Sequence, residues 1–195
     1  GAALTTGYSN VLLGKSAGAN FTDNHNNIAI GKGALDAAAA GELYNVAIGT
    51  DAMGAENGNA NYCTAVGYNT LLLQNGNVKN TAIGGLAGDA IVGGTENTLV
   101  GYLAGSAVSS GNSNTVVGHV AYQAGTGERN TIMGNGAGAA AMTGDENTLL
   151  GSAAGASLTD GPGNVCIGRK AGYLMTTGDY NIACLLYTSP SPRDR

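Results

Sequence analysis

The feature that most constrains this chain is a five-residue pattern that returns every 16 to 18 residues. In each copy an Asn is followed four residues later by a Gly, with an aliphatic residue just before the Gly, as in "NVAIG" from Asn45. A fixed period of this length indicates stacked repeat units rather than one globular core. With the Asn counted as offset zero, the Asn column is Asn10, Asn27, Asn45, Asn80, Asn97, Asn114, Asn130, Asn147, Asn164 and Asn181, and one further copy, "CTAVG", has Cys63 there. The Gly column at offset four is Gly14, Gly31, Gly49, Gly67, Gly84, Gly101, Gly118, Gly134, Gly151 and Gly168.

The composition agrees with a repeat array. Gly accounts for 34 of the 195 residues, more than twice the roughly 7% of average usage. Charged residues make up 11% of the chain, against a usual share of about 25%. Low charge alone would be compatible with disorder, but the periodic aliphatic residues offer a regular apolar face that a folded rod can bury.

Each copy is best interpreted as two short extended segments separated by two turns, and the first segment is a strand. Offsets one to three are short apolar residues or Thr, which favour a strand. Offset seven is Ala in nine of ten copies, with Thr70 as the exception, so a small side chain is required there. A second Gly or Asn, such as Gly94 or Gly127, closes most copies three residues before the next Asn. These two residue types tolerate the left-handed backbone best, so we expect that conformation at the closing position.

These columns predict an all-β fold, a parallel β-solenoid or β-roll of about eleven rungs over residues 1–183. A helix of useful length does not fit between two turns per 17 residues, so we expect the Ala-rich segment 36–43 to lose its helical propensity to its place in the rung. Equivalent strands would stack in parallel about 4.8 Å apart, which gives a rod roughly 50 Å long.

The predicted strand is apolar on both of its sides. Offsets one and three point to one side and offset two to the other. Offset three is Leu, Ile, Val or Met in every complete copy, so we expect the face of offsets one and three to form the core. Offset two is apolar as well, and a thin coil has one interior, which leaves an apolar stripe on the outside. We therefore predict an obligate homo-oligomer in which another subunit covers that stripe.

The pattern N-T-x-[ILV]-G-x-x-A-[GL], followed by a turn such as "LTTG" from Leu4 or "MTTG" from Met175, resembles the head repeats of trimeric autotransporter adhesins. It is equally similar to the repeats of phage and giant-virus tail-fibre proteins. The most specific element is "AIG", at residues 29–31, 47–49 and 82–84. The resemblance implies a left-handed β-roll, three chains per shaft, an extracellular place on a bacterial surface or a virion tail, and attachment to host cells or matrix.

Residues suited to catalysis or metal binding do not recur in any column. His25 lies in a turn and His119 in the variable column at offset five, so we expect both on the surface, without a metal or a catalytic role. The acidic residues do not form the Asp column of calcium-binding β-rolls. A net charge of −5 argues against binding to a nucleic acid backbone. We thus predict no enzyme, no cofactor, no metal and no nucleic-acid partner, and we expect the Asn column to form internal hydrogen bonds rather than a ligand-facing stripe.

Two more distant alternatives rest on particular columns. A Thr ladder at offset one, from Thr64 to Thr148, resembles the face of ice-binding solenoids, although we assign that face to the core. "IGKGAL" from Ile30 matches one hexapeptide of the left-handed helices found in acyltransferases. Those helices carry three such hexapeptides in each 18-residue turn, and most of this rung lacks the signature.

Two functional hypotheses follow, a receptor-binding adhesive module and a purely structural spacer. The adhesive hypothesis needs an exposed variable surface, which offsets five, six and nine provide. A host-surface glycan or protein would be the receptor, and we expect the contacts to come from Tyr68, Tyr102, Tyr122 and Tyr173.

The last residues depart from the repeat. Asn181 opens an eleventh copy in register, but Cys184 and Leu185 stand where an aliphatic residue and Gly are expected. The segment 184–195, "CLLYTSPSPRDR", resembles a translated sequencing adapter and is interpreted as a non-native tail. We expect the natural repeat array to continue at both ends of this chain.

Overall fold

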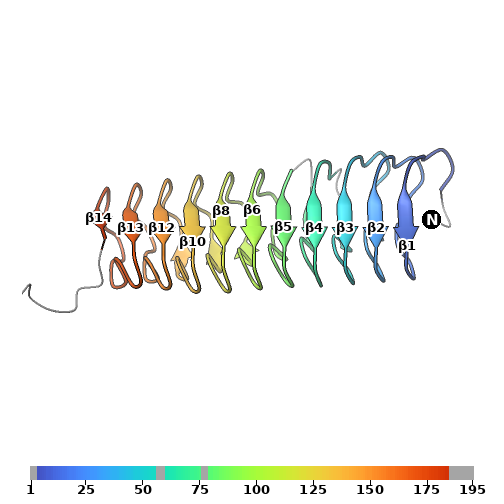
Figure 1. The fold of residues 1–195 in the computed structure, drawn as a ribbon. Helices are drawn as coiled ribbons and strands as arrows, with labels where there is room; N and C mark the ends of the chain where they lie inside the picture. The colour runs from blue at the N-terminus through green and yellow to red at the C-terminus, as the bar shows by residue number, and fades with distance from the viewer. Residues whose placement is uncertain (1–3, 56–59, 76–78, 185–195) are drawn as a thin grey trace, which may run out of the picture.

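The chain forms a rod of stacked coils in a computed structural model that describes residues 4–55, 60–75 and 79–184 (Figure 1). One parallel sheet of eleven strands runs along the whole rod. Its strands, in spatial order, are β1 Val11–Leu13, β2 Ile28–Ile30, β3 Val46–Ile48, β4 Thr64–Val66, β5 Thr81–Ile83, β6 Thr98–Val100, β8 Thr115–Val117, β10 Thr131–Met133, β12 Thr148–Leu150, β13 Val165–Ile167 and β14 Ile182–Ala183.

Each strand pairs in parallel with the equivalent strand of the next rung, at equal offsets. Leu99 of β6, for example, lies opposite Ala82 of β5 on one side and Val116 of β8 on the other. The predicted all-β parallel solenoid is therefore confirmed. The described residues contain no helix, and segment 36–43 is mostly irregular backbone despite its alanines, with a turn at residues 40–41 and a parallel bridge from Leu43 to His25. The last strand ends at Ala183, and the tail interpreted as non-native lies outside the described residues apart from Cys184.

The second half of each rung is less regular than the first. We expected an extended segment there in every rung. Only three rungs have one that pairs, in a small parallel sheet of β7 Ala107–Val108, β9 Ala124–Gly125 and β11 Ala141–Met142. In the other described rungs the same segment consists of turns and irregular backbone.

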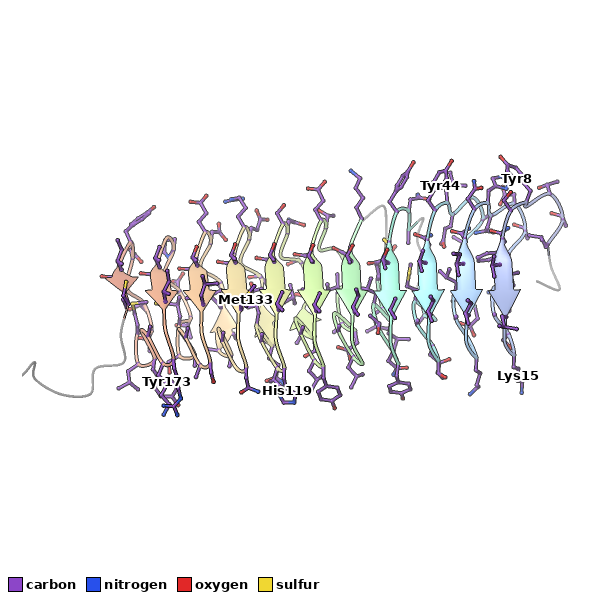
Figure 2. All side chains as sticks on the ribbon, in the orientation of Figure 1. Tyr8, Lys15, Tyr44, His119, Met133 and Tyr173 are labelled. Carbon is purple, nitrogen blue, oxygen red and sulfur yellow. The ribbon has the colours of Figure 1, made fainter. Side chains whose placement is uncertain are left out.

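The two faces of the main strand are the reverse of our expectation. Side chains at offset two point into the coil and, from Ala29 to Cys166, are 0% exposed. Offsets one and three point outward, and Met133 at offset three is 48% exposed (Figure 2). Alternation puts the first and third residues of a three-residue strand on one side and the middle residue on the other. Here the middle residue faces inward and its two neighbours face out. The assignment of offsets one and three to the core was wrong; an apolar outer stripe exists, but it lies on that face.

The buried apolar residues inside the coil come mainly from four columns, at offsets two, seven, eight and about eleven. Three of the four complete rungs that have Ala at offset two place a large side chain at offset eight: Ala29 with Leu35, Ala47 with Met53 and Ala65 with Leu71. The exception is Ala82, whose rung has Gly88 there. Where offset two is Leu99, offset eight is Gly105, at which an added Cβ would meet the Leu99 side chain at 2.8 Å. The coil is narrow, so in most rungs a large side chain at offset two goes with Gly at offset eight, and a small one at offset two goes with a large one at offset eight.

In described residues other than Gly, left-handed backbone is confined to three columns, at offsets six and eight and at the position just before the Asn. Large residues adopt positive φ at offset eight, including Leu35 (49°), Met53 (51°) and Tyr122 (45°). By contrast, Gly41 (φ 84°) is the one closing residue in the described part of the chain that has the expected left-handed φ. Gly127 closes its rung for another reason: a Cβ there would collide with the carbonyl of Gly144 in the next rung. Close approach of backbones, rather than turn conformation, selects Gly at that position.

Candidate functional site

The Asn column forms a continuous ladder of hydrogen bonds inside the rod. Asn114 shows the pattern. Its backbone N–H donates to Asn97 Oδ1 at 2.9 Å, and its Nδ2 donates to the same oxygen at 3.1 Å and to the Gly127 carbonyl at 3.0 Å. Its own Oδ1 accepts the backbone N–H of Asn130 at 3.0 Å. From Asn27 to Asn164 the ladder residues are at most 1% exposed, so they hold the rungs together and do not face a ligand.

One rung lacks the Asn, and a neighbouring side chain takes over part of its role. Cys63 donates its backbone N–H to Asn45 Oδ1 at 3.0 Å, which keeps the ladder on one side. On the other side Asn80 Nδ2 donates to Gln74 Oε1 at 3.1 Å, and Gln74 Nε2 lies 3.1 Å from Cys63 Sγ. Gln74 is fully buried at a position where other rungs have an apolar core residue such as Ile91 or Leu158. The Gln74 amide, from the opposite side of the coil, thus replaces the Asn amide that this rung lacks.

The outward face of the main sheet, at offsets one and three, is the first candidate surface. It combines the Thr ladder Thr64–Thr148 with a row of aliphatic residues that includes Ile83, Val100 and Met133. Ile83 is 43% exposed and Met133 is 48% exposed. Because the strands pair in register along the rod, the aliphatic row runs along this face from β1 to β13, and for six strands it lies beside the threonines. We call it the strand face.

Two edges flank the strand face. The entry edge consists of the residues one and two positions before the Asn, and the exit edge consists of offsets five, six and nine. Figure 2 shows Tyr8 and Tyr44 along the entry edge, and Lys15, His119 and Tyr173 along the opposite, exit edge.

The structure places three of the four predicted contact tyrosines on the exit edge. Tyr68 is 56% exposed, Tyr102 is 50% exposed and Tyr173 is 40% exposed. The Tyr102 ring stacks on that of His119, with 5.6 Å between ring centroids. His119 is exposed, as predicted.

The prediction for Tyr122 was wrong, because its side chain is fully buried. It occupies offset eight, which faces the inside of the coil. Its hydroxyl lies 3.0 Å from the Gly127 carbonyl, to which it donates a hydrogen bond. Burial raises the pKa of this hydroxyl far above its usual range. Tyr122 is therefore a core residue whose polar end is satisfied.

Sequence reasoning missed the aromatic residues of the entry edge. Tyr44 and Tyr62 stack with 5.1 Å between ring centroids, and Tyr8 stacks on His25 at 4.1 Å. Tyr44 and Tyr62 share the position just before offset zero in consecutive rungs, which was a usable signal. Other rungs have charged residues at the same position, such as Glu96 and Arg129, so the column did not stand out as aromatic.

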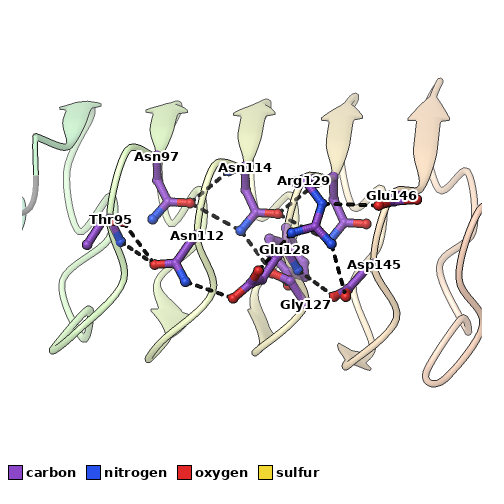
Figure 3. Close-up of polar contacts among 11 residues, drawn as sticks. Thr95, Asn97, Asn112, Asn114, Gly127, Glu128, Arg129, Asp145 and Glu146 are labelled. Atoms are coloured by element: carbon purple, nitrogen blue, oxygen red, sulfur yellow. Dashed lines mark hydrogen bonds and ion pairs between the residues drawn. The ribbon is translucent and has the colours of Figure 1, made fainter.

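The entry edge is acidic in the C-terminal half of the rod. Arg129 lies within 4 Å of three carboxylates, at 2.9 Å from Glu128, 3.5 Å from Asp145 and 3.1 Å from Glu146 (Figure 3). Asn112 extends this network, since its Nδ2 donates to Glu128 Oε1 at 2.8 Å. One cation among three carboxylates leaves this edge negatively charged.

The carboxylates of the exit edge are confined to the first five rungs. They are Asp36, Asp51 and Asp89. Burial raises the pKa of Asp36, and the nearby charge of Asp51 raises it further. Burial also raises the pKa of Asp89, whose Oδ1 has no hydrogen-bond partner. Between Tyr102 and Tyr173 the exit edge has no carboxylate, and it carries the cations Arg169 and Lys170.

Nowhere in residues 4–55, 60–75 and 79–184 do three or more His, Cys, Asp or Glu side chains come together in a group that could hold a metal ion. Those same residues include no helix long and apolar enough to span a membrane. No family model, curated protein or solved structure matches the chain.

Proposed function

We propose that this chain is a module of an extracellular fibre, built from several copies that bury the strand face and displayed on a bacterial surface or a virion tail, where it attaches its bearer to a host cell or matrix. The repeat solenoid fits a structural fibre module. The proposal gives the chain no catalytic role.

The observation that carries the proposal is the exposed apolar strand face. It is about 50 Å long and about 10 Å wide, roughly 500 Å² for each copy. A patch of that size is near the upper end of what a monomer leaves exposed. Two copies joined through it would bury roughly 1,000 Å², which is the lower limit for a specific interface. The resemblance to fibre repeats favours three copies.

Assembly can be tested with a charge placed on the strand face. Met133→Lys puts an ammonium group at a position that is already 48% exposed, so the fold itself should lose less than about 0.5 kcal/mol. We expect the unchanged rod to sediment as an oligomer and the variant as a monomer, because the interface would have to desolvate the charge. Ser152→Lys on the exit edge is the matched control and should leave the mass unchanged.

Light scattering coupled to gel filtration gives the mass of each rod directly. A monomeric mass for the unchanged rod would contradict assembly through the strand face. The spacer alternative shares this assembly and differs in predicting no binding to cells, glycans or matrix.

A second candidate function is ice binding, because the Thr ladder lies on the outside. Thr98, Thr115 and Thr131 are exposed on consecutive strands, spaced about 4.8 Å apart. This function needs the strand face free, whereas a fibre needs it buried. A monomeric rod with thermal hysteresis would support ice binding, and an oligomer without it would exclude this use of the face.

A further inference from the structure

The exit edge of the last five complete rungs combines aromatic rings, amide and imidazole groups and cations. The backbone holds this column in place rung by rung. Val120 N donates to the Tyr102 carbonyl at 2.9 Å, and Lys170 N donates to that of Ser152 at 2.9 Å. Four rung spacings separate its ends, about 19 Å. We call this surface the C-terminal exit edge: Tyr102, His119, Asn135, Arg169, Lys170 and Tyr173.

The side chains of this edge support one another. The Tyr102 and His119 rings lie 21° from parallel, and His119 Nδ1 is 3.1 Å from Asn135 Nδ2. Gly85 precedes Tyr102 in the column, and a Cβ there would lie 3.6 Å from the Tyr102 ring. Because Gly85 has no side chain, its rung leaves that face of the ring uncovered. At the far end, Lys170 Nζ lies 5.2 Å from the centroid of the Tyr173 ring.

The charges of the two edges differ in sign along these rungs. The C-terminal exit edge has Arg169 and Lys170 and no carboxylate. The entry edge of the same rungs has Glu128, Asp145 and Glu146 around its single arginine. An anionic ligand is therefore attracted to one edge and repelled by the other.

We propose that the C-terminal exit edge binds an acidic polysaccharide, a linear chain of pyranose rings that bear carboxylate or sulfate groups. The apolar face of a pyranose ring packs on an exposed tyrosine, while its hydroxyl groups bond with Asn135 and His119. The fork of Arg169 and the ammonium of Lys170 pair with the acidic groups.

A linear polymer also suits the shape of the surface, since successive sugars meet successive rungs. Each contact is shallow, so affinity comes from several rungs and from the repeated edges of an assembled fibre. The inference names the receptor class for the attachment role proposed above and rests on that role.

The test measures binding of the purified chain to three immobilised polysaccharides in about 0.15 M salt: sulfated heparin, carboxylated hyaluronan and neutral dextran. We expect binding to heparin or hyaluronan, weakened by added salt, and none to dextran. Arg169→Ala with Lys170→Ala, and Tyr102→Ala with Tyr173→Ala, should each weaken binding at least about tenfold, the effect of losing about 1.4 kcal/mol.

Matched controls come from the entry edge. Lys79→Ala with Arg129→Ala removes two cations, and Tyr44→Ala with Tyr62→Ala removes two exposed rings. Each double variant should bind within about twofold of the unchanged rod, which is a change of under about 0.5 kcal/mol in the free energy of binding. All eight positions lie at the rod surface, and melting temperatures verify folding. Arg169→Gln with Lys170→Gln repeats the test with side-chain length preserved.

Three results would overturn the inference: no binding to either acidic polysaccharide, equal binding to dextran, or equal losses from the entry-edge pairs. Mass measurements separate it from the proposed assembly. An oligomer that binds no acidic polysaccharide refutes the inference alone, and a monomer that binds one refutes the assembly alone.

Discussion

At the scale of single residues, a buried asparagine serves two rungs at once. Its amide nitrogen satisfies a carbonyl at the closing turn of its own rung, and its amide oxygen accepts the backbone N–H of the next ladder residue. A buried polar group without a partner costs about 1–3 kcal/mol. Asn therefore recurs because a shorter or apolar side chain would leave groups in both rungs unsatisfied.

The pair of Cys63 and Gln74 tests this explanation. Gln74→Leu removes the oxygen that accepts from Asn80 Nδ2, and we expect it to lower the free energy of unfolding by about 1–3 kcal/mol. Cys63→Asn supplies a new amide oxygen in the ladder position. In that background Gln74→Leu should cost at least about 0.5 kcal/mol less.

Urea unfolding of the two single variants and the double variant gives the coupling energy. Effects that add to within about 0.5 kcal/mol would show that Gln74 does not replace the missing amide.

Residues that every rung requires could be predicted from the sequence, and residues that depend on their neighbours could not. The Asn ladder and the Ala column were visible as identities. Tyr122 was not recognised as a core residue, because its place inside the coil depends on the space that Val116, smaller than the Leu99 and Leu149 of other rungs, leaves at offset eight. The left-handed conformation of Leu35 and Met53 had only an indirect signal, the Gly that six other rungs have at offset eight, because a large residue there resembles an ordinary core position.

At the scale of the element, each coil is a narrow tube whose filling is shared between columns. Strand positions were predictable because the strand residues repeat. The orientation of the strand was not, because a three-residue strand with apolar residues on both sides has no polar side to mark the solvent. The small second sheet, β7, β9 and β11, also lacked a signal, since "AV", "AG" and "AM" share no strand pattern.

If the columns at offsets two and eight share the space inside the coil, a larger residue in one should restore the stability lost when the other is made smaller. Leu99→Ala should lower the free energy of unfolding by about 2–5 kcal/mol, because it leaves a cavity. Gly105→Leu alone should cost about 1–3 kcal/mol, because the new side chain meets Leu99. Together they reproduce the arrangement of Ala65 with Leu71, where Leu71 tolerates a φ of 49°. We expect the double variant to be more stable than Leu99→Ala.

Thermal and urea unfolding of these three variants measure the effect. A double variant that is at least as unstable as the sum of both changes would contradict shared filling of the coil.

At the scale of the whole molecule, each inner rung is bonded to its two neighbours, and no hydrogen bond between the described residues reaches a rung beyond them. The strand order of the main sheet follows the chain, interrupted in numbering only by the strands of the small sheet. Stability in such a rod is a sum of rungs and of interfaces between adjacent rungs. The overall architecture was therefore the most predictable property, while partner and ligand depend on surfaces that vary from rung to rung.

Deletion of one repeat tests this additivity. Removing residues 148–164 joins Asn147 to Val165 and keeps every column in register. The deletion makes Ile132 and Cys166 neighbours in the core. Both of their rungs have Gly at offset eight, so the new junction brings no large side chain to that column. We expect a folded rod about 4.8 Å shorter, with the circular dichroism spectrum of the parent.

Removing residues 148–156 is the control, because it leaves half a rung and breaks the register of the sheet. That variant should lose its cooperative melting transition. If it melted at the same temperature as the deletion of a whole repeat, the rungs would not be the units of stability.

The in-register Asn ladder also bears on inheritance. Because nearly every junction between rungs uses the same bonds, a gene that gains or loses one repeat yields a rod that differs by one rung and needs no repair elsewhere. Recombination between copies then changes the length of the rod, and each added rung brings its own side chains to both edges. Reach and the number of contact points become traits that a population can tune by copy number, separately from the sequence of any single rung.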